Sequence, residues 1–356
     1  MPETDAKKLL IKQVYHDLKN KIISGEYRTG EIIPGQNKLE AQYNVSFPVI
    51  KEALNLLTAE KMLVHNSPEF KVCDLCREEQ LPHKLKYVAV VISEIDDYSQ
   101  IVFNRLEVEC RKRDLELLFY RHEMDNELQR RQYERASLHK NTLIVLFPNG
   151  PYCSWLQNSP HTSRTIIVDE AIPGAKAPQI ISDDDNGMYK LTRYLVELGH
   201  RHIAHLCAED RSTGYIRHFG YRRGLEDSGL KYDPTMVNNG KFQIQASITA
   251  FEQLLKAHPE ITACLCANDY SALGAIEAMR KLNLTPGKDI SLTGYGNFAV
   301  SEAIDLTTVD QQTGKICNQI AYMIDQYRSN GKMPQGIYPV PTELVIRGSC
   351  ASPKQR

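Results

Sequence analysis

The sequence lacks a long hydrophobic run and any surplus of charge of one sign. No apolar stretch among its 356 residues approaches the roughly 18 residues that a membrane-spanning helix needs. The first residues, MPETDAKKLLIKQ, include acidic side chains where a secretory signal has basic ones. We therefore expect a cytoplasmic protein with no membrane partner. The formal net charge is −1, so any site for nucleic acid must be local.

The sequence also lacks the cysteine pattern of a disulfide scaffold and the usual catalytic motifs. Its nine cysteines are an odd number and widely scattered, which predicts reduced thiols. Cys73 and Cys76 form a single CxxC, but a structural zinc site needs two further ligands and none follows nearby. We therefore predict no metal and no other cofactor. The sequence contains no GxGxxG after a strand, GxxxxGK[ST], HExxH or GxSxG, which argues against an enzyme.

What the sequence does contain is the composition of a globular protein with more than one domain. Hydrophobic residues make up 42% and charged residues 24%, as in ordinary folded proteins. A chain of this length fits two or three units of roughly 100 to 200 residues each.

The first 72 residues show the pattern of three helices and a hairpin. Apolar residues recur at helical spacing over residues 9–23, and a short second helix is predicted over residues 36–43. After a tight turn, Ser46 can cap a third helix that runs to about Ala59. The segment MLVHNSPEFKV then predicts two short strands around a turn. This order predicts a winged helix-turn-helix domain over residues 1–72.

The same 72 residues resemble the GntR family of DNA-binding domains. The matching segments are YHDLKNKII, SGEYRTGEIIPG, KLEAQYNVS and KEALNLLTAEKMLV. The family usually has arginine, threonine and arginine at the positions of Phe47, Val49 and Lys51. Phenylalanine and valine cannot make the bidentate contact to guanine that arginine makes, so base readout must differ. Phe47 then either touches a thymine methyl or packs against the first helix.

Other DNA contacts follow from the same resemblance. Ser46 and Lys51 are candidates for phosphate, and Gln36 and Asn37 can bond backbone or base. The wing lacks the family's glycines between Asn66 and Glu69. The complete set of predicted DNA-binding residues is Gln36, Asn37, Ser46, Phe47, Lys51, Asn66 and Lys71.

Beyond a polar linker predicted over residues 73–86, apolar strands alternate with amphipathic helices. Strands are predicted at VAVVI, LELLFY, TLIVLF, TIIVD, HIAHLC, ACLCA and ISLTGY. This alternation predicts an α/β, doubly wound architecture of parallel sheets. So many strands over residues 87–356 fit two lobes better than one sheet, with a ligand cleft at the carboxyl ends of the strands.

The region over residues 87–356 resembles the two-lobed, periplasmic-binding-protein-like effector domain of the LacI/GalR regulators. The matching words are YLVELGHRHIAHLC, IRHFGYRRGLEDSGL, CANDYSALGAIEAMRKLNL, DISLTGYGN, LTTVDQ and ELVIRGSC. The combination with a GntR-like head is similar to the arabinose repressor architecture. Because that family dimerises through both lobes, the resemblance implies a homodimer on a palindromic operator.

The resemblance also implies where an effector binds. A sugar site combines planar groups that bond hydroxyls with aromatic or apolar faces. Arg217 matches the family's arginine that bonds sugar hydroxyls, and Asn268 matches another family contact. The complete set of predicted effector-binding residues is Asp97, Tyr98, Asp169, Arg217, Asn268, Asp269, Asn297 and Gln311.

Alternative roles exist for some of these residues. Asp269 can instead cap the following helix, and Gln311 can instead stabilise a crossover between the lobes. At residues 294–297 the family reads G-[FY]-D-D and this chain reads GYGN, so Gly296 lacks the family's hydroxyl-binding carboxylate. Either Asn297 or another residue replaces it, or the effector is a deoxy sugar or carries a group such as phosphate.

These observations predict a DNA-binding transcription regulator of carbohydrate use, in the family's commoner direction a repressor. A sugar or sugar derivative between the lobes would control its affinity for operator DNA. The alternatives are a non-regulatory sugar-binding module, which has no use for the N-terminal head, and an α/β enzyme.

Overall fold

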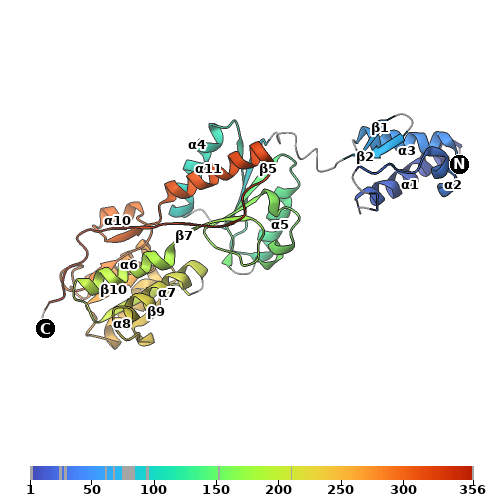
Figure 1. Cartoon of the computed structure of the whole chain (residues 1–356). Helices are drawn as coiled ribbons and strands as arrows, with labels where there is room; N and C mark the ends of the chain where they lie inside the picture. Colours follow the sequence, from blue (N-terminus) through green and yellow to red (C-terminus); the bar gives the residue numbers. More distant parts are fainter. Residues whose placement is uncertain are drawn as a thin grey trace. The chain divides into compact units, whose positions relative to one another are not determined.

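The computed structural model describes residues 3–23, 26–27, 30–60, 62–66, 69–73, 85–93, 96–150, 153–209 and 211–354. The chain divides into two compact units, Met1–His83 and Lys84–Arg356, and each is described by itself (Figure 1). Most of the predicted linker, including Cys76, lies outside the described residues. No helix in the described ranges is long and apolar enough to cross a membrane.

The N-terminal unit is a winged helix-turn-helix, as the sequence predicts. Its elements are α1 (Glu3–Ile23), α2 (Gln36–Tyr43), α3 (Phe47–Ala59), β1 (Leu63–Asn66) and β2 (Glu69–Val72). Asn44 ends α2 in the left-handed conformation, with φ 50°, and so reverses the chain between α2 and α3. The helices pack through fully buried leucines at positions 18, 39 and 54. Strands β1 and β2 pair antiparallel, with Leu63 opposite Val72.

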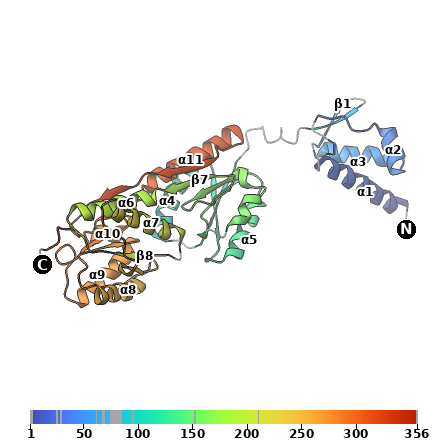
Figure 2. The ribbon, with the colours of Figure 1, turned by 60° about the horizontal axis from the view of Figure 1, so that its bottom comes forward.

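The second unit has two lobes, each built on a parallel sheet. The N-lobe sheet has the order β13-β7-β6-β5-β3-β4. The elements of this lobe are β3 (Tyr87–Ile92), α4 (Asp97–Arg111), β4 (Glu116–Arg121), α5 (Asn126–Ser137), β5 (Thr142–Leu146), β6 (Thr165–Val168), β7 (Pro178–Ser182), α11 (Thr313–Asn330) and β13 (Gly336–Val340). Helices α4 and α11 lie side by side on one face, and α5 covers the other (Figures 1 and 2).

The C-lobe repeats this plan with a shorter sheet of order β11-β10-β8-β9. Its elements are α6 (Asp184–Glu197), β8 (Ile203–Cys207), α7 (Ser212–Glu226), β9 (Val237–Asn239), α8 (Ile244–Ala257), β10 (Ala263–Cys266), α9 (Asp269–Lys281), β11 (Ser291–Thr293) and α10 (Ala299–Ala303). Helices α6 and α7 pack together, as do α8 and α9. Strands β12 (Thr308–Asp310) and β14 (Glu343–Val345) pair antiparallel and pack against α6 of this lobe.

All seven predicted strands of the effector domain are present, but the sequence analysis missed five others. The strands that it missed are β7, β9, β12, β13 and β14. Three of these are only three residues long. Pro178 begins β7, and Pro339 lies in the edge strand β13. Proline is tolerated at a strand's first residue and on an edge, where no ladder hydrogen bond is lost.

Candidate effector cavity and DNA-binding surface

A cavity of about 270 Å³ lies between the two lobes of the second unit, at the carboxyl ends of their strands. This is where open parallel sheets bind ligands. Six of the eight predicted effector residues line it: Asp97, Tyr98, Asp169, Arg217, Asn268 and Gln311. The N-lobe contributes Asp97, Tyr98 and Asp169, and the C-lobe contributes Arg217 and Asn268.

Arg217 is held in place from three directions. Its side chain is buried on α7, and Nε and one terminal nitrogen donate to Oδ2 of Asp184 at 3.1 and 2.9 Å. The other terminal nitrogen donates to the carbonyl of Ala267 at 2.9 Å. The guanidinium carbon lies 4.0 Å from the centroid of the Tyr295 ring. A guanidinium fixed in this way presents its remaining N–H groups to a ligand in one orientation.

The Tyr98 hydroxyl and the Asp169 carboxyl, both of the N-lobe, line the cavity. The hydroxyl of Tyr98 is buried and has no hydrogen-bond partner among the described residues. Burial, together with the neighbouring carboxylate of Glu170, raises the pKa of Asp169 to about 8. Such groups are expensive to bury alone, and a polar ligand would satisfy them.

Two hydrogen bonds join the lobes at the rim of the cavity. The hydroxyl of Tyr270 on α9 donates to Oδ2 of Asp97 on α4 at 2.5 Å. The hydroxyl of Ser212, at the start of α7, donates to the carboxylate of Glu170 in the N-lobe. The predicted effector contact Asp97 is therefore also part of a latch that holds the lobes together.

Asn268 occupies a capping position while lining the cavity. Its Oδ1 accepts from the backbone N–H of Ser271 at 2.7 Å, which caps α9. Its Nδ2 donates to the carbonyl of Phe242 at 3.3 Å. The sequence analysis gave this capping role to Asp269 as an alternative, and that prediction is wrong because Asn268 caps the helix.

Asp269 and Asn297 do not line the cavity. Asp269 is buried, and its carboxylate accepts hydrogen bonds from the Phe298 backbone and from the Thr308 hydroxyl. Asn297 donates to Asp310 and accepts from Arg347. Both side chains are used inside the C-lobe, where they fix the segment around residues 296–310.

Five of the seven predicted DNA-binding residues are exposed on the N-terminal unit: Asn37, Ser46, Phe47, Lys51 and Lys71. Phe47 and Lys51 lie one turn apart on α3 and are exposed, with 43% of Phe47 accessible. The alternative that Phe47 packs against α1 therefore finds no support. Ser46 is the N-cap of α3, but its hydroxyl makes no hydrogen bond to the first turn, contrary to the predicted side-chain cap.

The first turn of α2 lies next to this face. Gln36 is half-buried and Asn37 exposed, and the cap Gly35 offers no side-chain bond to the turn. No side-chain cap at Gly35 or Ser46 competes for the first backbone N–H groups of α2 and α3, those of Gln36, Asn37 and Phe47, and these could donate to phosphate. Lys71 is exposed on β2, and Asn66 belongs to β1.

Comparison with known proteins gives both units a family. Residues 10–67 match the model of the bacterial regulatory proteins of the gntR family, and residues 192–350 match that of a periplasmic binding protein-like domain. The HTH-type transcriptional repressor PurR of Haemophilus influenzae is 27% identical over 270 residues, covering 74% of this chain and 80% of that protein. The chain therefore joins a GntR-type DNA-binding domain to a periplasmic-binding-protein-like domain, and the relatives it matches are repressors such as PurR.

Solved structures show the same fold for this regulator. The transcriptional regulator CelR in complex with cellobiose matches with a TM-score of 0.66 and 20% identity, over 93% of this chain and 94% of that one. The dimeric Lac repressor with an 11-residue C-terminal deletion matches with a TM-score of 0.69 and 19% identity, over 76% and 100%. The relatives of the regulator are transcriptional repressors, not enzymes.

The regulator departs from its family at Gly296, and Phe298 explains the departure. Gly296 has φ +128°, and a Cβ there would lie 2.6 Å from the Phe298 ring. Phe298 lines the cavity. An aromatic ring therefore lies beside the position where the family places a carboxylate, and Asn297, which does not line the cavity, does not replace it.

Several cavity residues were missed by the sequence analysis. They are Asp96, Glu170, Arg211, Lys241, Phe242, Tyr270 and Phe298, together with smaller contributors. Lys241 and Phe242 both have positive φ, 54° and 57°, and lie in a loop without a family word. Tyr270 lies in the family-like segment CANDYSALGAIEAMRKLNL, two residues after Asn268, so its place in the sequence could have indicated a cavity contact.

Proposed function

We propose that this regulator binds operator DNA through the winged head and that a sugar or sugar phosphate held between the lobes controls that binding. The observation that carries the proposal is the cavity itself, in which a fixed guanidinium, an unpartnered tyrosine hydroxyl and a protonatable carboxyl converge. Effector binding and DNA binding are then coupled reciprocally, since each ligand changes the affinity for the other by the same factor.

The cavity lining favours an effector with both hydroxyls and an anionic group. On the C-lobe side, Arg211 and Lys241 add two cations beside Arg217, which suits a phosphate. On the N-lobe side, the lining is acidic and suits hydroxyl donors, with Asp96, Asp97, Asp169 and Glu170. Phe242 and Phe298 supply flat apolar surface of the kind that packs on a sugar ring. In the family's commoner direction, the bound effector relieves repression.

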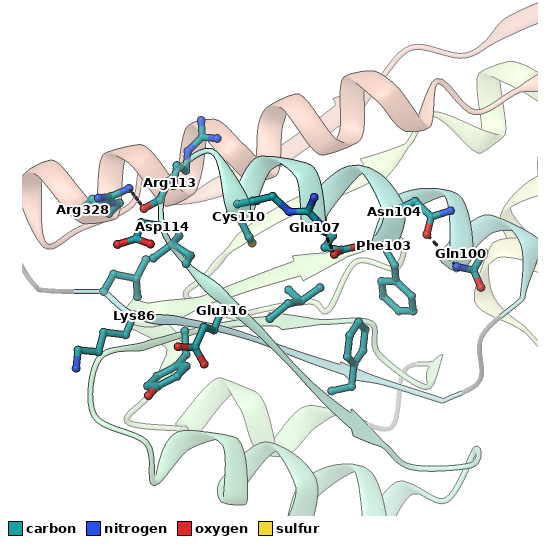
Figure 3. A pocket seen from close by; sticks show the side chains of 16 residues that line it. Lys86, Gln100, Phe103, Asn104, Glu107, Cys110, Arg113, Asp114, Glu116 and Arg328 are labelled. Carbon is teal, nitrogen blue, oxygen red and sulfur yellow. Dashed lines mark hydrogen bonds and ion pairs between the residues drawn. The ribbon is translucent and has the colours of Figure 1, made fainter.

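A homodimer is the proposed DNA-binding form, and the groove between α4 and β4 supports it. The groove, about 950 Å³, runs along the edge strand β4, with Gln100 and Asn104 near one end and Arg328 near the other (Figure 3). Val108 and Phe119, on these two elements, are 48% and 50% exposed. An exposed edge strand with apolar neighbours is a surface that proteins usually cover. Two heads in one dimer would read a palindromic operator in the cytoplasm.

Tyr98→Phe tests the effector site. The substitution removes only a buried hydroxyl that has no partner in the described part of the chain, so the ligand-free protein should unfold at the same temperature or slightly higher. A thermal-shift screen of monosaccharides and their phosphates identifies the effector, and calorimetry then compares its Kd. We expect the Kd of Tyr98→Phe to rise about tenfold, from the loss of about 1.4 kcal/mol.

The matched control is Tyr215→Phe, which alters a tyrosine on α7 that is 64% exposed and does not line the cavity. This control should bind like the wild type. An unchanged Kd in Tyr98→Phe, or equal losses in both variants, would contradict the placement of the effector.

A further inference from the structure

A second cluster of polar side chains lies in the C-lobe, between β8 and α7. Strand β8 alternates its side chains, so His205 and Cys207 point to the same face. The His205 ring stacks on Tyr221 of α7, with centroids 4.9 Å apart. That face is therefore the one covered by α7. His218 precedes Tyr221 by one helical turn on α7, which brings it to the carboxyl end of β8, where Cys207 lies.

Three different ligand types meet at this point. A ligand atom from each of Cys207, Glu209 and His218 lies within 4.8 Å of the other two. Cys207 is buried, His218 is half-buried, and Glu209 is exposed on the loop that follows β8. In a tetrahedral zinc site, bond lengths of about 2.0–2.3 Å separate the ligand atoms by roughly 3.3–3.8 Å. The ligand atoms would therefore need to approach one another by at most about 1–1.5 Å when an ion binds.

His218 has one ring nitrogen in a hydrogen bond and one without a partner among the described residues. Its Nε2 lies 3.1 Å from the hydroxyl of Tyr232. Its Nδ1 is buried and has no hydrogen-bond partner among the described residues. A metal-bound histidine usually makes a hydrogen bond through its second ring nitrogen, which fixes the tautomer and the ring plane. The Tyr232 hydroxyl supplies that bond, which leaves Nδ1 for an ion.

We propose that Cys207, Glu209 and His218 bind one divalent ion of the zinc class. A thiolate, an imidazole and a carboxylate together suit Zn²⁺, whereas Mg²⁺ and Ca²⁺ prefer oxygen ligands alone. The exposed side of Glu209 leaves the fourth position to water. The protein supplies these ligands from a strand end, a loop and a helix, so the ion ties the end of β8 to α7.

The ion would stiffen one wall of the effector cavity. Arg217 directly precedes His218 on α7. The segment that carries Glu209 leads to Arg211 and Ser212. Arg211 and Arg217 line the cavity, and Ser212 makes one of the two bonds between the lobes. Metal binding at this cluster therefore acts on residues of the effector site without touching the effector.

Cobalt titration of the full, metal-free chain tests the site. Co²⁺ replaces Zn²⁺ in such sites and reports a bound thiolate by a charge-transfer band and a tetrahedral geometry by its visible bands. We expect one equivalent of Co²⁺ to produce both features, and Zn²⁺ to abolish them. Cys207→Ser and His218→Gln should lose the charge-transfer band or the tetrahedral bands, respectively, and both should lose the rise in unfolding temperature that Zn²⁺ gives the wild type.

Three further variants separate this site from other causes. Tyr232→Phe retains every ligand and should weaken Zn²⁺ binding about tenfold, because it frees the His218 ring. The double variant Cys73→Ser/Cys76→Ser removes the CxxC near the domain boundary and should bind Co²⁺ like the wild type. Glu209→Gln changes only an exposed side chain, so it should fold normally and bind Zn²⁺ more weakly. Absence of the thiolate band, or its loss only in Cys73→Ser/Cys76→Ser, would overturn the proposal.

Discussion

Removing Arg217 should destabilise the effector domain strongly, because it strands a buried charge. Arg217 and its partner Asp184 are 6% and 3% exposed, and both Nε and a terminal nitrogen donate to the same carboxylate oxygen. In Arg217→Met the hydrophobic stem remains, and among the described residues the Asp184 carboxylate keeps only the Tyr295 hydroxyl, at 2.9 Å. Breaking a buried pair from one side costs about 3–5 kcal/mol.

Urea unfolding of the full chain, followed by circular dichroism, measures this loss. Adding Asp184→Asn removes the stranded charge and keeps an oxygen that can accept from Tyr295. We therefore expect the double variant to regain about 1–3 kcal/mol relative to Arg217→Met. The matched control is Arg222→Met, five residues further along α7, whose exposed pair with Glu226 should contribute nothing measurable. A loss of less than about 1 kcal/mol in Arg217→Met, or strict additivity in the double variant, would refute this reasoning.

Three further predictions concern the cavity. Tyr270→Phe removes the interlobe bond to Asp97 and should raise the effector Kd about tenfold, as calorimetry would show; an unchanged Kd would count against the latch. Asp169 binds its proton up to a pKa of about 8 in the folded state, against 3.8 when free, so its contribution to stability falls as pH rises through that window. Asp169→Asn should therefore gain unfolding temperature relative to the wild type between pH 5 and 8, whereas parallel pH profiles would contradict the assignment. Gly296→Ala puts a Cβ against the Phe298 ring at a positive φ, and it should lower the free energy of unfolding by about 1–3 kcal/mol, measured by thermal unfolding. An unchanged stability would show that the clash does not exist.

Much of the fold is predictable from the sequence because its local signals agree with one another. The word KLEAQYNVS places α2 and the turn, and Asn44 takes the left-handed conformation that such a turn needs. Five or six consecutive apolar residues, as in β3 and β5, have the pattern of strands buried on both faces. The short strands β9, β12 and β14 give no such signal, because three residues cannot show a period.

The candidate site is only partly predictable, because side-chain pairing depends on segments far apart in the chain. The segments that resemble the LacI/GalR family place Arg217 and Asn268 at the cavity. Nothing in the sequence shows that Tyr270 donates a hydrogen bond to Asp97, 173 residues away. Asp269 illustrates the opposite error: an acidic residue beside a predicted contact turns inward to Thr308. The cluster of Cys207, Glu209 and His218 matches no standard metal-ligand spacing, since a strand end and a helix bring it together.

The coupling between effector and DNA is the central claim, and fluorescence anisotropy tests it most directly. DNA selected from a random pool by the full chain is titrated with the regulator, with and without the effector found in the thermal-shift screen. We expect the selected DNA to be an inverted repeat and the effector to change its affinity by about 5- to 150-fold. An affinity that is the same with saturating effector, on DNA that the winged head binds specifically, would contradict the account.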